Sequence, residues 1–201
     1  MTPLTRRATA EYRRATDDQI TRGHRWYEDA HTVAREQAET YNLTIEVTSG
    51  VLAALSPRLG WGSNVAIAER MLASHGTLDR GALGRSLSQA RAIYAGTPVL
   101  DVLGGPKTRA FYENILTAGD SKLAVIDRHA WDMLVGKRGA TPPTKAQYRE
   151  AAARMRSAAV ILGEQLAAVQ ATTWLVWRAR FWNQGAFDHR PQPMLEGAMT
   201  W

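Results

Sequence analysis

Apolar residues recur every three or four positions along most of the chain, a spacing that places them on one face of an α-helix. The first such face is marked by Trp26, Ala30, Val33, Ala34 and Ala38. The same spacing predicts further helices over residues 64–72, 86–94, 108–116, 127–135, 145–168 and 172–182. Residues 43–47 form a β-branched run that fits a short strand, but they lead into residues 49–55, which fit a buried helix better. The pattern therefore predicts an all-α protein.

Proline and glycine mark where several of these helices begin and end. The Pro142-Pro143-Thr144 segment is a start signal for the long helix that follows, because proline fits the first helical turn. Gly96 and Pro98 end the helix before the hairpin. We therefore expect a single helical domain over residues 1–184 and an irregular tail over residues 185–201, where the periodicity is lost.

The composition limits the chemistry that such a fold can carry. With 201 residues, 45% of them hydrophobic, the chain is long enough to bury one substantial core. The absence of cysteine excludes disulfides, thiolate zinc sites and cysteine-ligated iron–sulfur clusters, and no metal or cofactor is expected. The longest nearly uncharged run, residues 47–54, is too short to span a membrane. Because the basic N-terminus lacks the apolar segment of a secretion signal, we expect a cytoplasmic protein.

The chain is basic, with a formal net charge of +6 and a sequence pI of about 10.0. A positive excess favours an anionic partner, because each phosphate that a cationic side chain neutralises releases condensed counterions. Nucleic acid is one such partner, but charge by itself does not distinguish it from others.

A glycine pair lies between an apolar helix end and a new helix start, in a predicted hairpin over residues 101–116. Glycine there would let the backbone turn at positive φ and leave the N–H groups of the next helix accessible. The glycine, cationic and hydroxyl residues of this turn are Gly104, Gly105, Lys107, Thr108 and Arg109. They fit a turn that grips phosphate, and they also fit an ordinary helix connection whose lysine faces solvent.

A second candidate lies in residues 124–135, where a carboxylate follows a short apolar run. Asp127 stands at the mouth of a predicted helix, so its oxygen can accept the unpaired N–H groups of the first turn. The alternative is a carboxylate that is aimed at a bound sugar or base. His129, two residues later, fits a structural hydrogen bond better than a catalytic role.

The two segments together resemble the helix-hairpin-helix (HhH-GPD) DNA glycosylase superfamily. Its members carry a glycine-rich hairpin that ends in Gly-x-Lys and, further along the chain, a Val-Asp-x-His segment with the essential aspartate. The number of residues between these two motifs is similar to that between Lys107 and Asp127 here. Gly105-Pro106-Lys107 and Ile126-Asp127-Arg128-His129 match these motifs, and Trp131 also has counterparts in the superfamily. The chain is similar as well to small uncharacterised actinobacterial and phage proteins with Leu-Ser-Pro-Arg, Gly-Pro-Lys and Ile-Asp-x-His segments.

The region before the hairpin is similar to the superfamily in plan, although Ser56-Pro57-Arg58 replaces its Gln-Gln-Thr loop and Leu103 stands where the hairpin's first glycine is expected. In the superfamily this loop faces the DNA and the base pocket. The resemblance therefore implies DNA contacts by Arg58, Trp61 and Asn64, and pocket or supporting roles for Ser56, His129 and Trp131. Alternatively, Trp61 closes over the core and Arg58 caps a helix C-terminus.

The resemblance implies a DNA glycosylase-like hydrolase or lyase that acts on a base flipped out of DNA. Asp127 would stabilise the positive charge that develops on the sugar. Lys107 would either attack C1′ and form a Schiff base, or clamp a phosphate while water attacks. The expected partner is DNA, bound by a monomer in a bacterium or a phage-infected host cell.

Two other functions remain open. Some phage-associated relatives of the superfamily are thought to act in DNA pyrimidine hypermodification, which would use the same polar residues around a flipped base. The second is a non-catalytic helix-hairpin-helix DNA-binding module. It predicts that backbone N–H groups alone satisfy Asp127 and that no cavity lies beside it.

Overall fold

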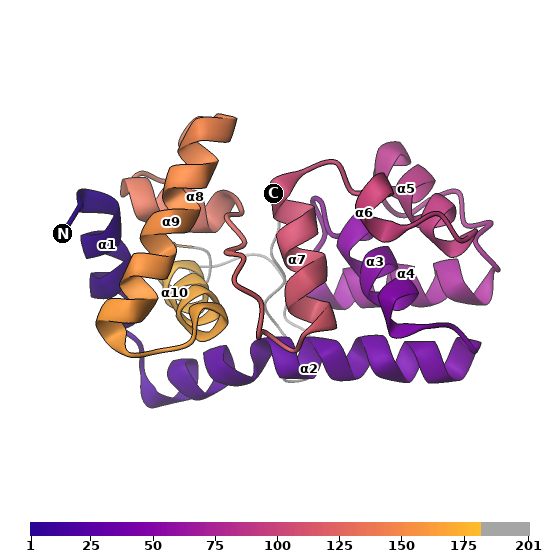
Figure 1. Ribbon diagram of the computed structural model, residues 1–201, viewed down its shortest axis with the longest axis horizontal. Helices are drawn as coiled ribbons and strands as arrows, with labels where there is room; N and C mark the ends of the chain where they lie inside the picture. The colour runs from indigo at the N-terminus through magenta and orange to yellow at the C-terminus, as the bar shows by residue number, and fades with distance from the viewer. Residues whose placement is uncertain (182–201) are drawn as a thin grey trace. The chain divides into compact units, whose positions relative to one another are not determined.

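The computed structural model describes residues 1–181, and within them every regular element is an α-helix (Figure 1). The helices are α1 (Pro3–Tyr12), α2 (Asp17–Tyr41), α3 (Ile45–Leu55), α4 (Trp61–Ala73), α5 (Gly84–Tyr94), α6 (Val99–Val102), α7 (Pro106–Leu116), α8 (Arg128–Val135), α9 (Lys145–Leu162) and α10 (Leu166–Phe181). The predicted all-α class is confirmed for this part of the chain. The tail predicted over residues 185–201 lies outside the described residues.

The described chain divides into two compact units, where the sequence predicted one domain over residues 1–184. The first unit consists of Met1–Tyr27 together with residues 119–181, and the second consists of Glu28–Ala118. Helix α2 begins in the first unit and ends in the second. The hairpin that carries Lys107 therefore belongs to the second unit, and the segment that carries Asp127 belongs to the first.

The first unit packs α1, α8, α9 and α10 around a common core, as Figure 1 shows. Helix α1 contacts the other three, and α10 contacts α8 and α9. The buried core side chains come from all four helices and include Tyr12, Leu134, Met155, Val169 and Trp177. Gly23 of α2 lies against α10, where an added Cβ would overlap the Thr172 hydroxyl and lie 2.8 Å from the Thr172 backbone nitrogen. This close approach requires glycine.

Helix α3 is the centre of the second unit and contacts α4, α5, α6 and α7. Every residue from Thr48 to Leu55 is buried, which explains why this run has no polar face. The Thr44 side chain accepts the Val47 N–H and begins the helix at Ile45. A strand over residues 43–47 is therefore wrong, because these residues supply the N-cap and first turn of α3.

The long helix predicted over residues 145–168 is two helices. Its start is confirmed, because Thr144 and Gln147 form a capping box at the first turn of α9. It ends at Leu162, because Gly163 adopts a left-handed φ of 70°, and α10 begins three residues later. Together the two helices have the length and composition of a membrane span, but they bend by 101° at the break. No single described helix is long and apolar enough to cross a membrane.

Candidate functional site

The predicted hairpin connects α6 to α7 in the second unit. Helix α6 ends at Val102, and α7 begins at Pro106 with Gly105 as its N-cap. Neither Gly104 nor Gly105 has a positive φ, and a Cβ on either would meet its nearest atom at 3.5 Å, an ordinary contact. The expectation that these glycines turn the backbone at positive φ is therefore wrong. Because the N-cap residue Gly105 has no side chain, the first turn of α7 has no side-chain cap.

Lys107 points into the second unit, and only 3% of its surface is exposed. Its ammonium donates a hydrogen bond of 2.8 Å to the Ser56 hydroxyl and lies 5.3 Å from the ring centre of Phe111. Ser56 in turn donates to the Ala53 carbonyl at the end of α3, at 2.9 Å. The structure thus brings together two predicted site residues, one from the hairpin and one from the loop after α3.

Thr108 and Arg109 stabilise the hairpin itself. The Thr108 hydroxyl donates to the carbonyl of the N-cap glycine at 3.1 Å. The exposed Arg109 guanidinium donates to the carbonyls of Leu100 and Leu103 at the end of α6. Arg85 of α5 approaches the first hairpin glycine, with its Nη2 3.5 Å from the position that a Cβ would take. Arg85 was not predicted, and nothing in its sequence neighbourhood indicated that the fold would bring it there.

The three predicted DNA contacts before the hairpin differ in exposure. Arg58 is exposed and has a φ of 63°, a left-handed conformation that residues other than glycine rarely adopt. Trp61 is buried and packs edge-on against Phe111, with ring centres 6.3 Å apart. Asn64 is also buried and donates to the Leu52 carbonyl at 3.0 Å. Trp61 and Asn64 therefore hold the loop in place, and Arg58 is the member of this set that faces solvent.

Asp127 is the N-cap of α8 in the first unit, which confirms the predicted capping role. Its Oδ1 accepts the Ala130 N–H at 2.7 Å, and its Oδ2 accepts the indole N–H of Trp174 on α10 at 3.0 Å. The side chain is fully buried. Because each oxygen has a donor on a different helix, the carboxylate is held in one orientation.

Two polar side chains, the partly buried Tyr148 and the buried Gln170, hold the segment that leads to this aspartate. The Tyr148 hydroxyl of α9 accepts the Ile126 N–H at 3.2 Å and donates to the Ala124 carbonyl at 3.1 Å. Gln170 of α10 accepts the Val125 N–H at 2.6 Å. The segment lies in no helix, so these side chains supply the partners that regular secondary structure would otherwise give to its backbone.

Gln170 extends this network to α2 by donating to the Tyr27 hydroxyl at 2.8 Å. Burial raises the pKa of Tyr27 above its ordinary range, and the nearby negative charge of Asp127 acts in the same direction. Burial likewise raises the pKa of Tyr148 to about 12. Both phenols are therefore neutral at physiological pH. The sequence signal for this network was a glutamine within an otherwise apolar stretch of α10, which we did not single out.

His129 is buried near the start of α8 and is neutral at physiological pH. Burial, together with the positive charges of Arg178, Arg128 and Arg138, lowers its pKa to about 4. Arg178 also lies over the Trp174 ring, 4.8 Å from its centre. The positive charges that act on His129 come from α8, from the loop after it and from α10, and the sequence analysis missed this combination because the three arginines lie in separate segments.

Trp131 and the neighbouring Asp132 have supporting roles. Trp131 packs in the core and donates its indole N–H to the Thr141 carbonyl at 2.8 Å. The buried Asp132 carboxylate accepts the N–H groups of Gly139 and Ala140 at 2.7 and 2.9 Å, which holds the loop after α8. Within residues 1–181, no three His, Asp or Glu side chains are grouped so that they could hold a metal ion.

Over residues 1–181, the fold is all-helical, with a buried lysine at one helix start and a buried, oriented aspartate at another. The chain belongs to a family of unknown function (DUF7178), and the match covers residues 1–181. No curated protein and no solved structure matches the chain.

Proposed function

We propose that this protein acts on a base flipped out of DNA, by chemistry at the N-glycosidic bond. The resemblance of its lysine and aspartate motifs to those of HhH-GPD DNA glycosylases suggests the reaction. The observation that carries the proposal is the burial of Lys107, whose ammonium is held by Ser56. A lysine that only clamps phosphate keeps its charged end in water, whereas a buried amine fits a role as nucleophile. We therefore favour the amine role of Lys107 over the clamp.

In the proposed reaction, the bond between C1′ of the sugar and the base nitrogen breaks, and its electron pair leaves with the base. The positive charge that develops on the sugar is stabilised by the Asp127 carboxylate, which Ala130 and Trp174 hold in place. The resemblance to the HhH-GPD superfamily implies the nucleophile: a lysine amine at the position of Lys107 loses a proton and bonds to C1′, and ring opening gives a Schiff base. With water as the nucleophile, the product would instead be an abasic sugar.

Exposed arginines supply the phosphate contacts that the proposal requires. In the second unit, these are Arg58 of the loop after α3, Arg85 of α5 and Arg109 of the hairpin. In the first unit, we assign the same role to the exposed Arg128 and Arg138. Each such contact adds affinity that falls with salt and carries little sequence information.

The partners of Asp127 do not match one of the two predictions of the non-catalytic module. It predicts that backbone N–H groups alone satisfy this carboxylate. The Trp174 indole N–H also donates to the Asp127 carboxylate, so a side chain from α10 helps to orient this carboxylate. An orientation of this kind is what a carboxylate that faces a substrate needs.

The test incubates the protein with duplex DNA that contains uracil, abasic sites or hydroxymethylated pyrimidines. We expect released or altered bases, detected by mass spectrometry of nucleosides, and an adduct that borohydride traps. Asp127→Asn should abolish the chemistry, and Lys107→Ala should abolish the adduct. The matched controls are Asp120→Asn and Lys122→Ala, which make the same charge changes at exposed positions and should leave activity unchanged.

The outcomes separate the alternatives. An adduct that persists in Lys107→Ala would refute the amine role. Free base in the products indicates excision, whereas an altered nucleoside without free base indicates DNA modification. Salt-dependent DNA binding without either product, on all of these substrates, would favour the non-catalytic module.

A further inference from the structure

A second charged site lies in the first unit, at the end of α8 opposite to Asp127. Asp127 caps the start of α8, whereas Met133 and Gly136, at its C-terminal end, line a cavity of about 410 Å³. Residues of α1 and α10 complete the lining. A cavity of this size is large enough for a small ligand.

The lining of this cavity has a strong excess of positive charge. Its arginines are Arg6, Arg7, Arg14 and Arg180, and among the lining side chains of residues 1–181 the acidic one is Glu11. Trp177 and Phe181 supply apolar surface beside them. Four guanidinium groups against one carboxylate favour an anion in this cavity.

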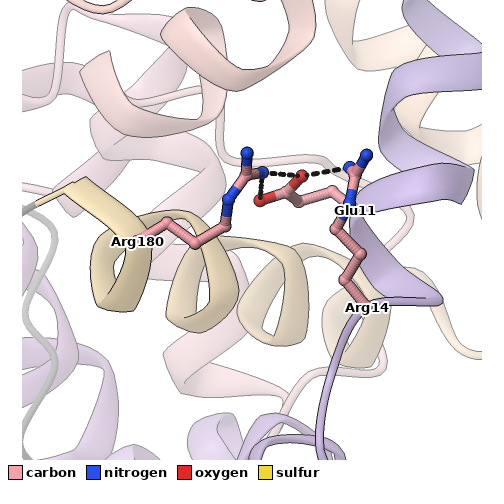
Figure 2. A network of polar contacts seen from close by, with 3 residues as sticks. All are labelled: Glu11, Arg14 and Arg180. Atoms are coloured by element: carbon pink, nitrogen blue, oxygen red, sulfur yellow. Dashed lines mark hydrogen bonds and ion pairs between the residues drawn. The ribbon is translucent and has the colours of Figure 1, made fainter.

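Glu11 orients two of these arginines, as Figure 2 shows. The carboxylate is buried and accepts hydrogen bonds from Nη1 of Arg180 at 2.7 and 2.8 Å and from Nη1 of Arg14 at 2.9 Å. The Arg180 guanidinium also lies over the Phe181 ring, 5.0 Å from its centre. Since the carboxylate engages only Nη1 of each arginine, Nε and Nη2 of both remain as donors for a ligand.

The other two arginines differ in how they are held. Arg7 donates from Nη1 to the Leu134 carbonyl at 3.1 Å, at the end of α8. Arg6 is exposed, and its guanidinium has no hydrogen bond or ion pair with another residue among 1–181. The cavity thus combines three arginines held by the fold with one that carries no structural bond.

We propose that this cavity binds a phosphate group, with Arg14 and Arg180 oriented for it by Glu11 and with Arg6 adding a further contact. Guanidinium groups present paired N–H donors that match the oxygens of phosphate, and a carboxylate that fixes their orientation lowers the entropy lost on binding. The phosphate belongs either to a free phosphate compound or to the DNA backbone. The proposal does not depend on base chemistry at Asp127.

The test uses the full chain and two probes, pyrophosphate by isothermal titration calorimetry and a short DNA duplex at several salt concentrations. Arg6→Gln is the test variant, because it removes a cavity charge that holds no other part of the protein. Arg13→Gln is its matched control, an exposed arginine close by that does not line the cavity. We expect Arg6→Gln to weaken phosphate binding about 3- to 10-fold and Arg13→Gln to change it less than about twofold.

The two probes identify the source of the phosphate. Weaker pyrophosphate binding by Arg6→Gln at unchanged DNA affinity indicates a free phosphate compound. Weaker DNA binding and a shallower salt dependence in Arg6→Gln, but not in Arg13→Gln, indicate the DNA backbone. Any result in which the two variants behave alike toward both probes overturns the proposal, including a wild-type protein that binds neither. These binding measurements do not use base chemistry, so a failure of the phosphate-site proposal can be distinguished from a failure of the proposed function.

Discussion

Replacing Gln170 with leucine removes both hydrogen bonds that tie α10 to the segment before Asp127 and to α2. Gln170 is buried, accepts the Val125 N–H at 2.6 Å and donates to the Tyr27 hydroxyl at 2.8 Å. Leucine has a similar volume, so the change in packing is small and the lost hydrogen bonds dominate the effect.

The free energy of unfolding should fall substantially. The buried Val125 N–H loses its acceptor, which costs about 1–3 kcal/mol, and the lost bond to Tyr27 adds about 1 kcal/mol. The sum of about 2–4 kcal/mol corresponds to a fall in Tm of about 4–16 °C for a protein of this size.

Urea denaturation followed by tryptophan fluorescence measures this free energy. Gln165→Leu is the matched control, because it makes the same substitution at an exposed position and should change stability by less than about 0.5 kcal/mol. A Gln170→Leu protein as stable as Gln165→Leu would refute the conclusion that the glutamine holds this segment in place.

Three further predictions concern stability. The first concerns His129, whose pKa falls from 6.5 to about 4 on folding, so that the unfolded state binds more protons than the folded state between these pH values. The free energy of unfolding should therefore decrease by roughly 3 kcal/mol as the pH falls from 6.5 to 4. His129→Gln should flatten this slope in urea titrations, and an equal slope would contradict the assignment. Gly23→Ala should lower the free energy of unfolding by about 3 kcal/mol, because the added Cβ overlaps Thr172. Gly84→Ala is the control, because a Cβ there meets no atom within 4 Å, and it should not lower Tm. Equal melting temperatures of the two variants would count against the close approach of Gly23 to Thr172. Asp132→Asn should cost about 1–3 kcal/mol in denaturation, because one backbone N–H in the loop after α8 loses its acceptor. It should leave base chemistry per folded molecule unchanged, and loss of that chemistry in a folded variant would show that Asp132 does more than hold the loop.

The sequence by itself determined the helical class, the start of α9 and the capping position of Asp127. These features depend on residues within a few positions of one another: apolar spacing, a capping threonine and an aspartate before a helix. The end of α9 depends on an equally local signal, Gly163, but an apolar pattern that continues past it concealed the break. The strand prediction for residues 43–47 was wrong for a related reason, since β-branched side chains also fit the first turn of a buried helix.

Only the tertiary structure decided where the side chains of the candidate site point. Lys107 could equally have faced solvent, and it is buried because the hairpin packs against the loop after α3, which carries Ser56. Likewise, Arg85 lies beside the hairpin and Arg180 lies beside Glu11, although in both cases the two residues or segments are far apart in the chain. No local pattern encodes such contacts, because they arise when helices bury their apolar faces against one another and thereby bring polar residues together.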